Sequence, residues 1–258
     1  MTRTAINPFF AARTQRSPRQ PRHATSHATY AKLPLAPVNT SPVPHLTSLY
    51  HNSEAGNYGS RAYPGNCGGN LIKDLLLYFR PRGLVFDPMS GSGTCRDVCD
   101  ELGIPCLSWD IHDGFDACDP EVFSARDTFD FIWAHPAYWR QKLYANDARD
   151  LSRAPTLEDF LRRYGRFIRN CARALKPEGK LVILMGDYCD RKAGFVPLTH
   201  HTKRLAFESG LRQHCTDIIR FSHGASSSRK VYRSSFIPGL HDVCMVFEKG
   251  QDEKGGRP

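Results

Sequence analysis

Two short polar segments hold the residues best suited to chemistry, and each directly follows an apolar run. The first, DPMSGSGT at residues 87–94, contains Gly91 and Gly93, which allow a tight turn and close approach of the backbone to a ligand. Amide groups at the start of a following helix would favour negative charge on that ligand. On spacing alone, packing glycines in an ordinary turn explain the pattern better. The segment lacks the Gly-Lys-Ser/Thr ending of a phosphate-binding P-loop.

The second segment, HPAYW at residues 135–139, can supply a hydrogen-bond acceptor next to aromatic rings. A neutral imidazole at His135 has one acceptor nitrogen, whereas a protonated imidazole has none. Pro136 holds His135 in an extended conformation. Taken alone, the segment is equally compatible with an ordinary turn or with the remnant of a decayed active site.

Two acidic residues lie between these segments. Asp110 ends an apolar stretch that begins at Pro105, about 20 residues after the glycine turn, where a carboxylate can accept hydrogen bonds from both hydroxyls of a ribose. A helix cap or a surface charge is the alternative role for Asp110. Asp116 follows Gly114-Phe115 and is expected near an adenine ring if a nucleoside binds here.

Together, the two segments resemble the motifs of the S-adenosylmethionine-dependent DNA amino-methyltransferases, which modify N6 of adenine or N4 of cytosine. Residues 87–94 resemble the family's DPFxGSGT cofactor motif, and residues 135–139 resemble its (D/N/S)PP(Y/F/W) catalytic motif. The resemblance extends over about residues 58–248 and includes YPGN at residues 63–66, similar to a motif that covers the methionine end of the cofactor. It implies S-adenosyl-L-methionine as cofactor, bound by Pro64, Asp87, Pro88, Ser90, Gly91, Gly93, Thr94, Asp110 and Asp116.

The resemblance also implies a catalytic set. The amino nitrogen of a nucleobase is conjugated with its ring and is a poor nucleophile. In the family, two acceptors form hydrogen bonds with the N–H groups of this nitrogen, which moves it toward tetrahedral geometry and frees its lone pair. An aromatic ring stacks on the flipped-out base. Here those roles fall to the His135 side chain, the Pro136 carbonyl and the Tyr138 ring, with Trp139 as a second aromatic wall. His135 and Ala137 depart from the motif, which leaves open adenine or cytosine as the target and, alternatively, a catalytically impaired DNA-binding pseudoenzyme.

Two long segments with basic and aromatic residues, 140–155 and 222–239, are expected to contact DNA. The contact residues predicted from them are Arg140, Tyr144, Arg229, Lys230 and Arg233. Mobile, solvated surface is the alternative interpretation of both segments. An RNA base or a small molecule is the alternative methyl acceptor.

Alternating apolar strands and helices must position these residues. Strands are predicted at 84–87, 105–110, 129–134, 181–185, 216–221 and 242–248, and helices at 70–79, 94–102, 156–175 and 197–209. The alternation predicts an α/β fold with a mainly parallel sheet and helices on both faces. The resemblance implies the Rossmann-like class I methyltransferase form with seven strands. In such sheets ligands bind beyond the carboxyl ends of the strands, where both polar segments fall.

Composition sets the remaining expectations. The 258 residues carry a net charge of +9, of which the segment before Glu54 supplies six, which favours either a polyanionic partner or a solvated tail. We predict a disordered basic tail over residues 1–45, a methyltransferase domain over 46–250 and a flexible tail over 251–258. Nine cysteines without a CxxC pair indicate reduced, core-filling residues of a cytoplasmic protein, with no metal site. No apolar run is long enough to cross a membrane. The sequence leaves the oligomeric state unknown.

Overall fold

The computed structural model describes residues 38–51, 56–190, 192–221, 237 and 239–251. Most of the two predicted tails therefore lies outside the described residues. The part of the N-terminal tail that is described packs on the domain, because Val43 is buried and His45 Nε2 lies 2.9 Å from Asp74 Oδ2. Among the described residues, no helix combines the length and apolar composition needed to cross a bilayer.

A mixed sheet organises the described residues, with the strand order β1-β9-β10-β5-β4-β2-β3 and with β8 paired to β10. Strands β2 to β5 are mutually parallel, and β10 runs antiparallel to β5, β8 and β9. The sheet has eight strands rather than the expected seven. The strands are β1 (Leu49–Tyr50), β2 (Val85–Asp87), β3 (Cys106–Ser108), β4 (Phe129–Ala134), β5 (Leu175–Met185), β8 (Leu211–Gln213), β9 (Ile218–Arg220) and β10 (Asp242–Lys249).

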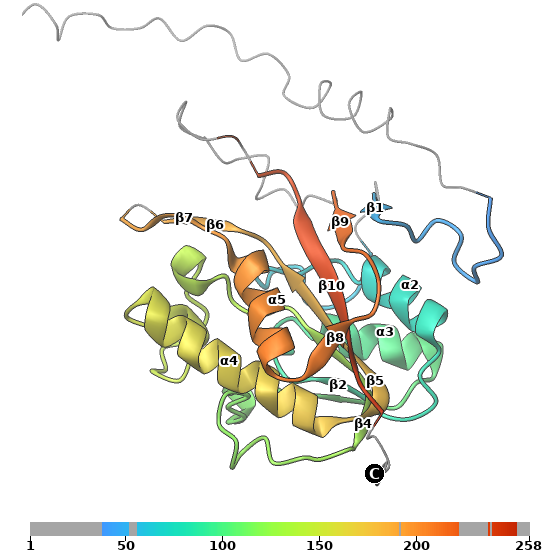
Figure 1. The fold of residues 1–258 in the computed structure, drawn as a ribbon, viewed down its shortest axis with the longest axis horizontal. Helices are drawn as coiled ribbons and strands as arrows, with labels where there is room; N and C mark the ends of the chain where they lie inside the picture. The colour runs from blue at the N-terminus through green and yellow to red at the C-terminus, as the bar shows by residue number, and fades with distance from the viewer. Residues whose placement is uncertain (1–37, 52–55, 191, 222–236, 238, 252–258) are drawn as a thin grey trace, which may run out of the picture. The chain divides into compact units, whose positions relative to one another are not determined.

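Helices cover both faces of this sheet, as predicted (Figure 1). In β4, Phe131 and Trp133 pack with α2 (Asn70–Phe79) and α3 (Thr94–Leu102), whereas the alternate residues Ile132 and Ala134 pack with α4 (Leu157–Ala174) and α5 (Leu198–Glu208). The same alternation continues in β5 and β10, so the central strands are buried on both faces. This explains why the sequences of these strands are continuous apolar runs.

The helix boundaries follow local sequence signals. The predicted ranges for α2 and α3 agree with the structure. Helix α4 begins after the N-cap Thr156, whose Oγ1 accepts a hydrogen bond from the Asp159 amide at 3.0 Å. A small antiparallel hairpin of β6 (Tyr188–Asp190) and β7 (Gly194–Val196) was not predicted from the sequence.

The strand order sets the place for a ligand. Strand β2 pairs with β3 on one side and with β4 on the other, and β4 pairs in turn with β5. The connection from β2 to β3 and the connection from β4 to β5 therefore run in opposite directions from a switch point between β2 and β4. Such a switch point opens a crevice beyond the carboxyl ends of the strands. The segments that follow β2, β3 and β4 are therefore brought to one edge of the sheet.

Candidate active site

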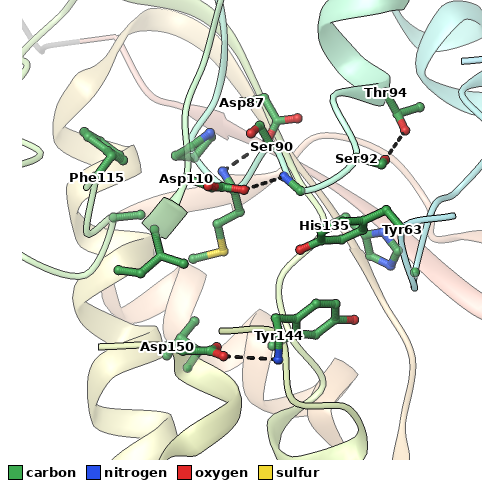
Figure 2. A pocket seen from close by; sticks show the side chains of 18 of the residues that line it. Tyr63, Asp87, Ser90, Ser92, Thr94, Asp110, Phe115, His135, Tyr144 and Asp150 are labelled. Carbon is green, nitrogen blue, oxygen red and sulfur yellow. Dashed lines mark hydrogen bonds between the residues drawn. The ribbon is translucent and has the colours of Figure 1, made fainter. Parts of the chain in front are cut away.

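An open pocket lies at these strand ends, with about 850 Å³ of space including its mouth to solvent. Asp87 at the end of β2, Asp110 after β3 and His135 after β4 all line it. Figure 2 shows Asp110 and Phe115 at one end of the pocket and His135 and Tyr63 at the other.

The glycine turn has the conformation that its sequence requires. Gly91 and Gly93 have φ angles of +48° and +77°, in the left-handed region that favours glycine. A Cβ atom at Gly91 would lie 2.9 Å from Cε1 of Tyr63, so this ring packs directly on the turn. Gly91 lines the pocket, whereas Gly93 is the N-cap of α3 and is not among the lining residues.

Asp110 fixes the turn and also caps a helix. Its Oδ2 accepts a hydrogen bond from the Gly91 amide at 3.0 Å, and its Oδ1 accepts one from the His112 amide at 2.8 Å. The second bond caps the short 3₁₀ helix η2 (Ile111–Asp113). Asp110 is therefore a helix cap, which is one of the roles considered from the sequence, and it also lines the pocket.

Asp87 is a buried carboxyl group on the pocket wall. Its side chain accepts a hydrogen bond from the Met89 amide at 3.1 Å. Burial nevertheless raises the pKa of Asp87 to about 8, because removal of solvent disfavours the charged form more than this amide stabilises it. Asp87 is therefore largely protonated at neutral pH.

His135 is connected to a chain of polar side chains behind the pocket. Its Nε2 lies 3.1 Å from the Tyr138 hydroxyl, which donates a hydrogen bond to Asp242 Oδ1 at 3.3 Å. The other oxygen of Asp242 accepts a hydrogen bond from Arg220 Nη2 at 2.6 Å, and Arg220 Nη1 donates to the Cys67 carbonyl at 3.1 Å.

Charges along this chain are set by burial and by one ion pair. Burial and, to a smaller extent, the positive charge of Arg220 lower the pKa of His135 to about 4, so the imidazole is neutral at physiological pH. Burial alone would raise the pKa of Asp242, but Arg220 outweighs burial and the pKa is lowered. The chain therefore contains a carboxylate, a guanidinium and a neutral imidazole.

Arg220 and Asp242 were not predicted as site residues, although the topology explains their position. Because β10 is antiparallel to β5, its first residue, Asp242, lies at the edge where the parallel strand β5 ends at Met185. Arg220 ends β9 and is paired in register with Asp242. The reversed direction of the last strand, β10, brings both residues to this edge. Predicting this direction from the sequence would have identified them.

Tyr138 lies behind His135 and is not among the residues that line the pocket. Its ring packs on Gly186, where an added Cβ would lie 2.8 Å from Cε2 of the ring. Among the rings that do line the pocket, Tyr144 and Tyr63 are stacked, with centroids 5.9 Å apart and planes 19° apart. Tyr144 was predicted as a substrate contact, whereas Tyr63 was missed although it directly precedes Pro64.

The prediction of Trp139 as an aromatic wall is wrong. Trp139 is 2% exposed and its Nε1 donates a hydrogen bond to the Ala154 carbonyl at 3.0 Å, so it belongs to the core. Its φ of +46° is unusual for a bulky residue and turns the chain into the 3₁₀ helix η3 (Trp139–Gln141). Arg140 is exposed and lies over the Trp139 ring, 4.1 Å from its centroid, rather than in the pocket.

The segment after the catalytic motif is held by one buried carboxylate. Asp150 accepts hydrogen bonds from the amides of Tyr144, Ala145 and Ser152, at 3.2, 2.8 and 2.8 Å. Figure 2 shows the first of these bonds at the base of the pocket. The described segment 140–155 is thus organised by Asp150, which lines the pocket and was not predicted as a site residue.

The structure brings most predicted cofactor residues together. Those that line the pocket are Pro64, Asp87, Pro88, Ser90, Gly91, Thr94, Asp110 and Asp116, together with His135 and Tyr144. Pro136 is buried and is not among the lining residues. Arg229, Lys230 and Arg233 lie outside the described residues.

Three of the nine cysteines lie together in space, although the sequence contains no CxxC pair that would indicate a cluster. The sulfur atoms of Cys95, Cys99 and Cys106 all lie within 4.8 Å of one another. The sequence did not indicate this cluster, because Cys106 approaches the other two only through the turn between α3 and β3.

No protein-family model and no curated protein matches the sequence. Among solved structures, a Thermus thermophilus protein assigned as a DNA modification methylase and solved with S-adenosyl-L-methionine aligns over 55% of this chain and 56% of its own, at 21% identity and TM-score 0.39. A SAM-dependent methyltransferase from Methanosarcina mazei aligns over 67% and 94%, at 11% identity and TM-score 0.41. This chain thus spans little more than half of the Thermus protein, and at these scores neither similarity decides its function.

Replacing Trp139 tests its assignment to the core. Trp139→Phe removes the indole N–H and leaves the buried Ala154 carbonyl without its donor, so we expect the free energy of unfolding in urea to fall by about 1–3 kcal/mol. Trp109→Phe is the matched control, because Trp109 is 42% exposed, and its effect should be smaller. Equal effects of the two substitutions would contradict the assignment.

Proposed function

We propose that this protein transfers a methyl group from S-adenosyl-L-methionine to the exocyclic amino group of a base in DNA. The observation that carries the proposal is that one pocket is lined by the glycine turn, by Asp110 and by a neutral imidazole at His135. The glycine turn and Asp110 can hold a nucleoside cofactor. The neutral imidazole can accept a hydrogen bond from an amino group, which must lose part of its conjugation with the base before it can attack the methyl group.

The charge of the pocket favours a cationic ligand. Its lining includes four aspartates, of which Asp87 is largely protonated at neutral pH, and a single arginine, Arg149, which forms an ion pair with Asp147 at 2.8 Å. The lining aspartates are Asp87, Asp110, Asp116 and Asp150. S-adenosylmethionine supplies a methyl group on a positively charged sulfur and also carries an ammonium group. Asp110 would accept from the ribose, with the Phe115 ring beside the adenine and the sulfur toward His135.

The hydrogen-bond chain assigns the tautomer of His135. Asp242 is ionised and only accepts, so the single hydroxyl proton of Tyr138 is directed to it. The Tyr138 oxygen then accepts from His135 Nε2–H. A neutral imidazole carries one N–H, so Nδ1 keeps its lone pair. We assign Nδ1 as the acceptor for one N–H of the target amino group. The Pro136 carbonyl is proposed as the second acceptor on the resemblance of the motif alone, because Pro136 does not line the pocket.

This tautomer also defines what His135 does during transfer. With a pKa of about 4, the imidazole is a weak base that accepts a hydrogen bond but does not hold a proton at neutral pH. The proton released by the methylated nitrogen therefore passes to solvent. Tyr144 and Tyr63 replace Tyr138 and Trp139 as the rings proposed to contact the base, because both line the pocket and the two rings predicted from the motif do not.

DNA is proposed as the methyl acceptor on the resemblance of residues 135–139 to the catalytic motif of amino-directed enzymes and on the net charge of +9. Phosphate contacts favour basic proteins whatever the base sequence. The two target bases, adenine N6 and cytosine N4, both fit a site built from two acceptors.

Methyl transfer from tritiated S-adenosylmethionine tests the proposal. We expect label in unmethylated DNA, and digestion to nucleosides with mass analysis should identify the modified base. His135→Ala should reduce transfer by about 100-fold or more, since removing one preorganised hydrogen-bonding group at a reacting centre costs about 10²–10³ in rate, while cofactor binding is retained. Label in RNA or a small molecule but not in DNA would reject the proposed substrate. Cofactor binding without any transfer would indicate a pseudoenzyme.

The pH dependence of cofactor binding tests the role of Asp87. A cationic ligand favours the charged carboxylate, but below pH 8 this group is largely protonated without ligand and must lose its proton on binding. The affinity for S-adenosylmethionine should therefore fall as pH decreases from 8 to 6, by up to about tenfold per pH unit. Calorimetry should find a weaker dependence in Asp87→Asn. The same slope in both proteins would contradict this role.

Tyr138→Phe separates the hydroxyl group from the ring. The substitution keeps the ring on Gly186 but removes the oxygen that receives His135 Nε2–H. We expect kcat to fall about tenfold, equivalent to about 1.4 kcal/mol, with unchanged affinity for S-adenosylmethionine. Tyr138 acts here as a positioning residue. Unchanged kcat in Tyr138→Phe, with loss of activity in Tyr138→Leu, would favour the ring as the functional part.

A further inference from the structure

Three cysteine side chains converge between α3 and the sheet, outside the pocket. Cys95 and Cys99 are four residues apart on α3 and so lie on the same face of the helix. Gly103, with a φ of +65°, ends the helix, and the chain returns after a short turn to β3, which begins at Cys106. The three sulfur atoms lie within 4.8 Å of one another.

The cluster is enclosed on one side and partly open on the other. Cys95 and Cys99 are fully buried in the apolar layer between the helices and the sheet, whereas Cys106 is partly exposed. Cysteine as a small apolar residue accounts for each position singly. This core-filling role does not require three sulfur atoms to converge on one point. Three converging sulfur atoms can act together as soft ligands for a metal ion.

We propose that Cys95, Cys99 and Cys106 bind one thiophilic metal ion, Zn²⁺ or Cu⁺, through three thiolate sulfurs. Metal–thiolate bonds are about 2.3 Å long, so three sulfurs around one ion lie about 4 Å apart. The observed separations of at most 4.8 Å require only a small inward movement. Cu⁺ accepts three thiolates, and Zn²⁺ would complete its tetrahedron with water on the open side at Cys106.

Metal binding displaces the protons of the three cysteine thiols. The thiols release their protons as the metal–sulfur bonds form, so affinity increases with pH. No electrons are transferred. The ion would connect α3, which begins at Thr94 of the glycine turn, to β3, which leads to Asp110. Both Thr94 and Asp110 line the pocket, so the metal would stabilise two of its walls without entering it.

Metal titration of the full-length chain tests this site. The exposed Cys189 and Cys215 are first replaced by Ser, and the protein is reduced and stripped with a chelator. Zn²⁺ and Cu⁺ are then titrated in separate arms, with Cd²⁺ as an optical probe of thiolate binding. We expect one equivalent of ion to bind, with a thiolate-to-metal charge-transfer band for Cd²⁺ and Cu⁺.

Matched cysteine variants locate the ion. Cys99→Ser or Cys106→Ser should lower the affinity at least about tenfold and remove most of the band, whereas Cys171→Ser, a buried cysteine outside the cluster, should retain both. Circular dichroism checks that each variant is folded. If the variants unfold, X-ray absorption of the unsubstituted zinc form provides the test, with three sulfur neighbours at about 2.3 Å expected.

Several results would overturn the proposal. The first is that none of Zn²⁺, Cu⁺ and Cd²⁺ binds at one equivalent in the titrations. The second is that the charge-transfer band persists in Cys99→Ser. The third is that X-ray absorption of the zinc form finds fewer than three sulfur neighbours. A disulfide between two of these cysteines in protein purified without reductant would also overturn it. None of these outcomes depends on methyl transfer. The proposed metal site and the proposed enzymatic activity are therefore tested independently of each other.

Discussion

The ion pair between Arg220 and Asp242 is the interaction on which the arrangement of the site depends. A carboxylate that is partly removed from water is costly unless it is paired, and here a guanidinium 2.6 Å from the partly buried Asp242 keeps it ionised. An ionised Asp242 can only accept, which directs the Tyr138 hydroxyl toward it and leaves the oxygen of Tyr138 for His135. Removing either partner would leave an uncompensated buried charge. The position of the imidazole N–H, and with it the lone pair of Nδ1, therefore depends on two residues far from His135 in sequence, whereas burial is the main reason that the imidazole is neutral.

Sheet topology explains how these residues meet. Strands β2, β3 and β4 are parallel, so the polar residues at their carboxyl ends are gathered at one edge. The reversed strand β10 starts at that edge, and β9 ends there in register with it. In the proposed function, the pocket has a cofactor half built on β2 and β3 and an acceptor half built on β4, whose His135 is held from behind by residues of β9 and β10. The proposed reaction needs both halves to face one cavity.

Local signals in the sequence predict the elements well and the cross-chain contacts poorly. The ranges of α2 and α3 are predicted correctly because apolar spacing and end signals lie within each segment. Strands β1 and β8, with two and three residues, are too short to carry a period. Trp139 was misplaced because the motif suggests a ligand contact, whereas a partner at Ala154 holds the indole in the core. The cysteine cluster was missed because its members meet only after α3 turns back onto the sheet.

The central claim concerns which way a cofactor lies in the pocket. The most direct measurement is a crystal structure of the protein with S-adenosylhomocysteine bound. We predict the ribose hydroxyls on Asp110, the adenine beside Phe115 and the sulfur directed toward His135, with Nδ1 facing the space beyond it. A ligand bound elsewhere, or one with its sulfur at the Phe115 end, would contradict the account.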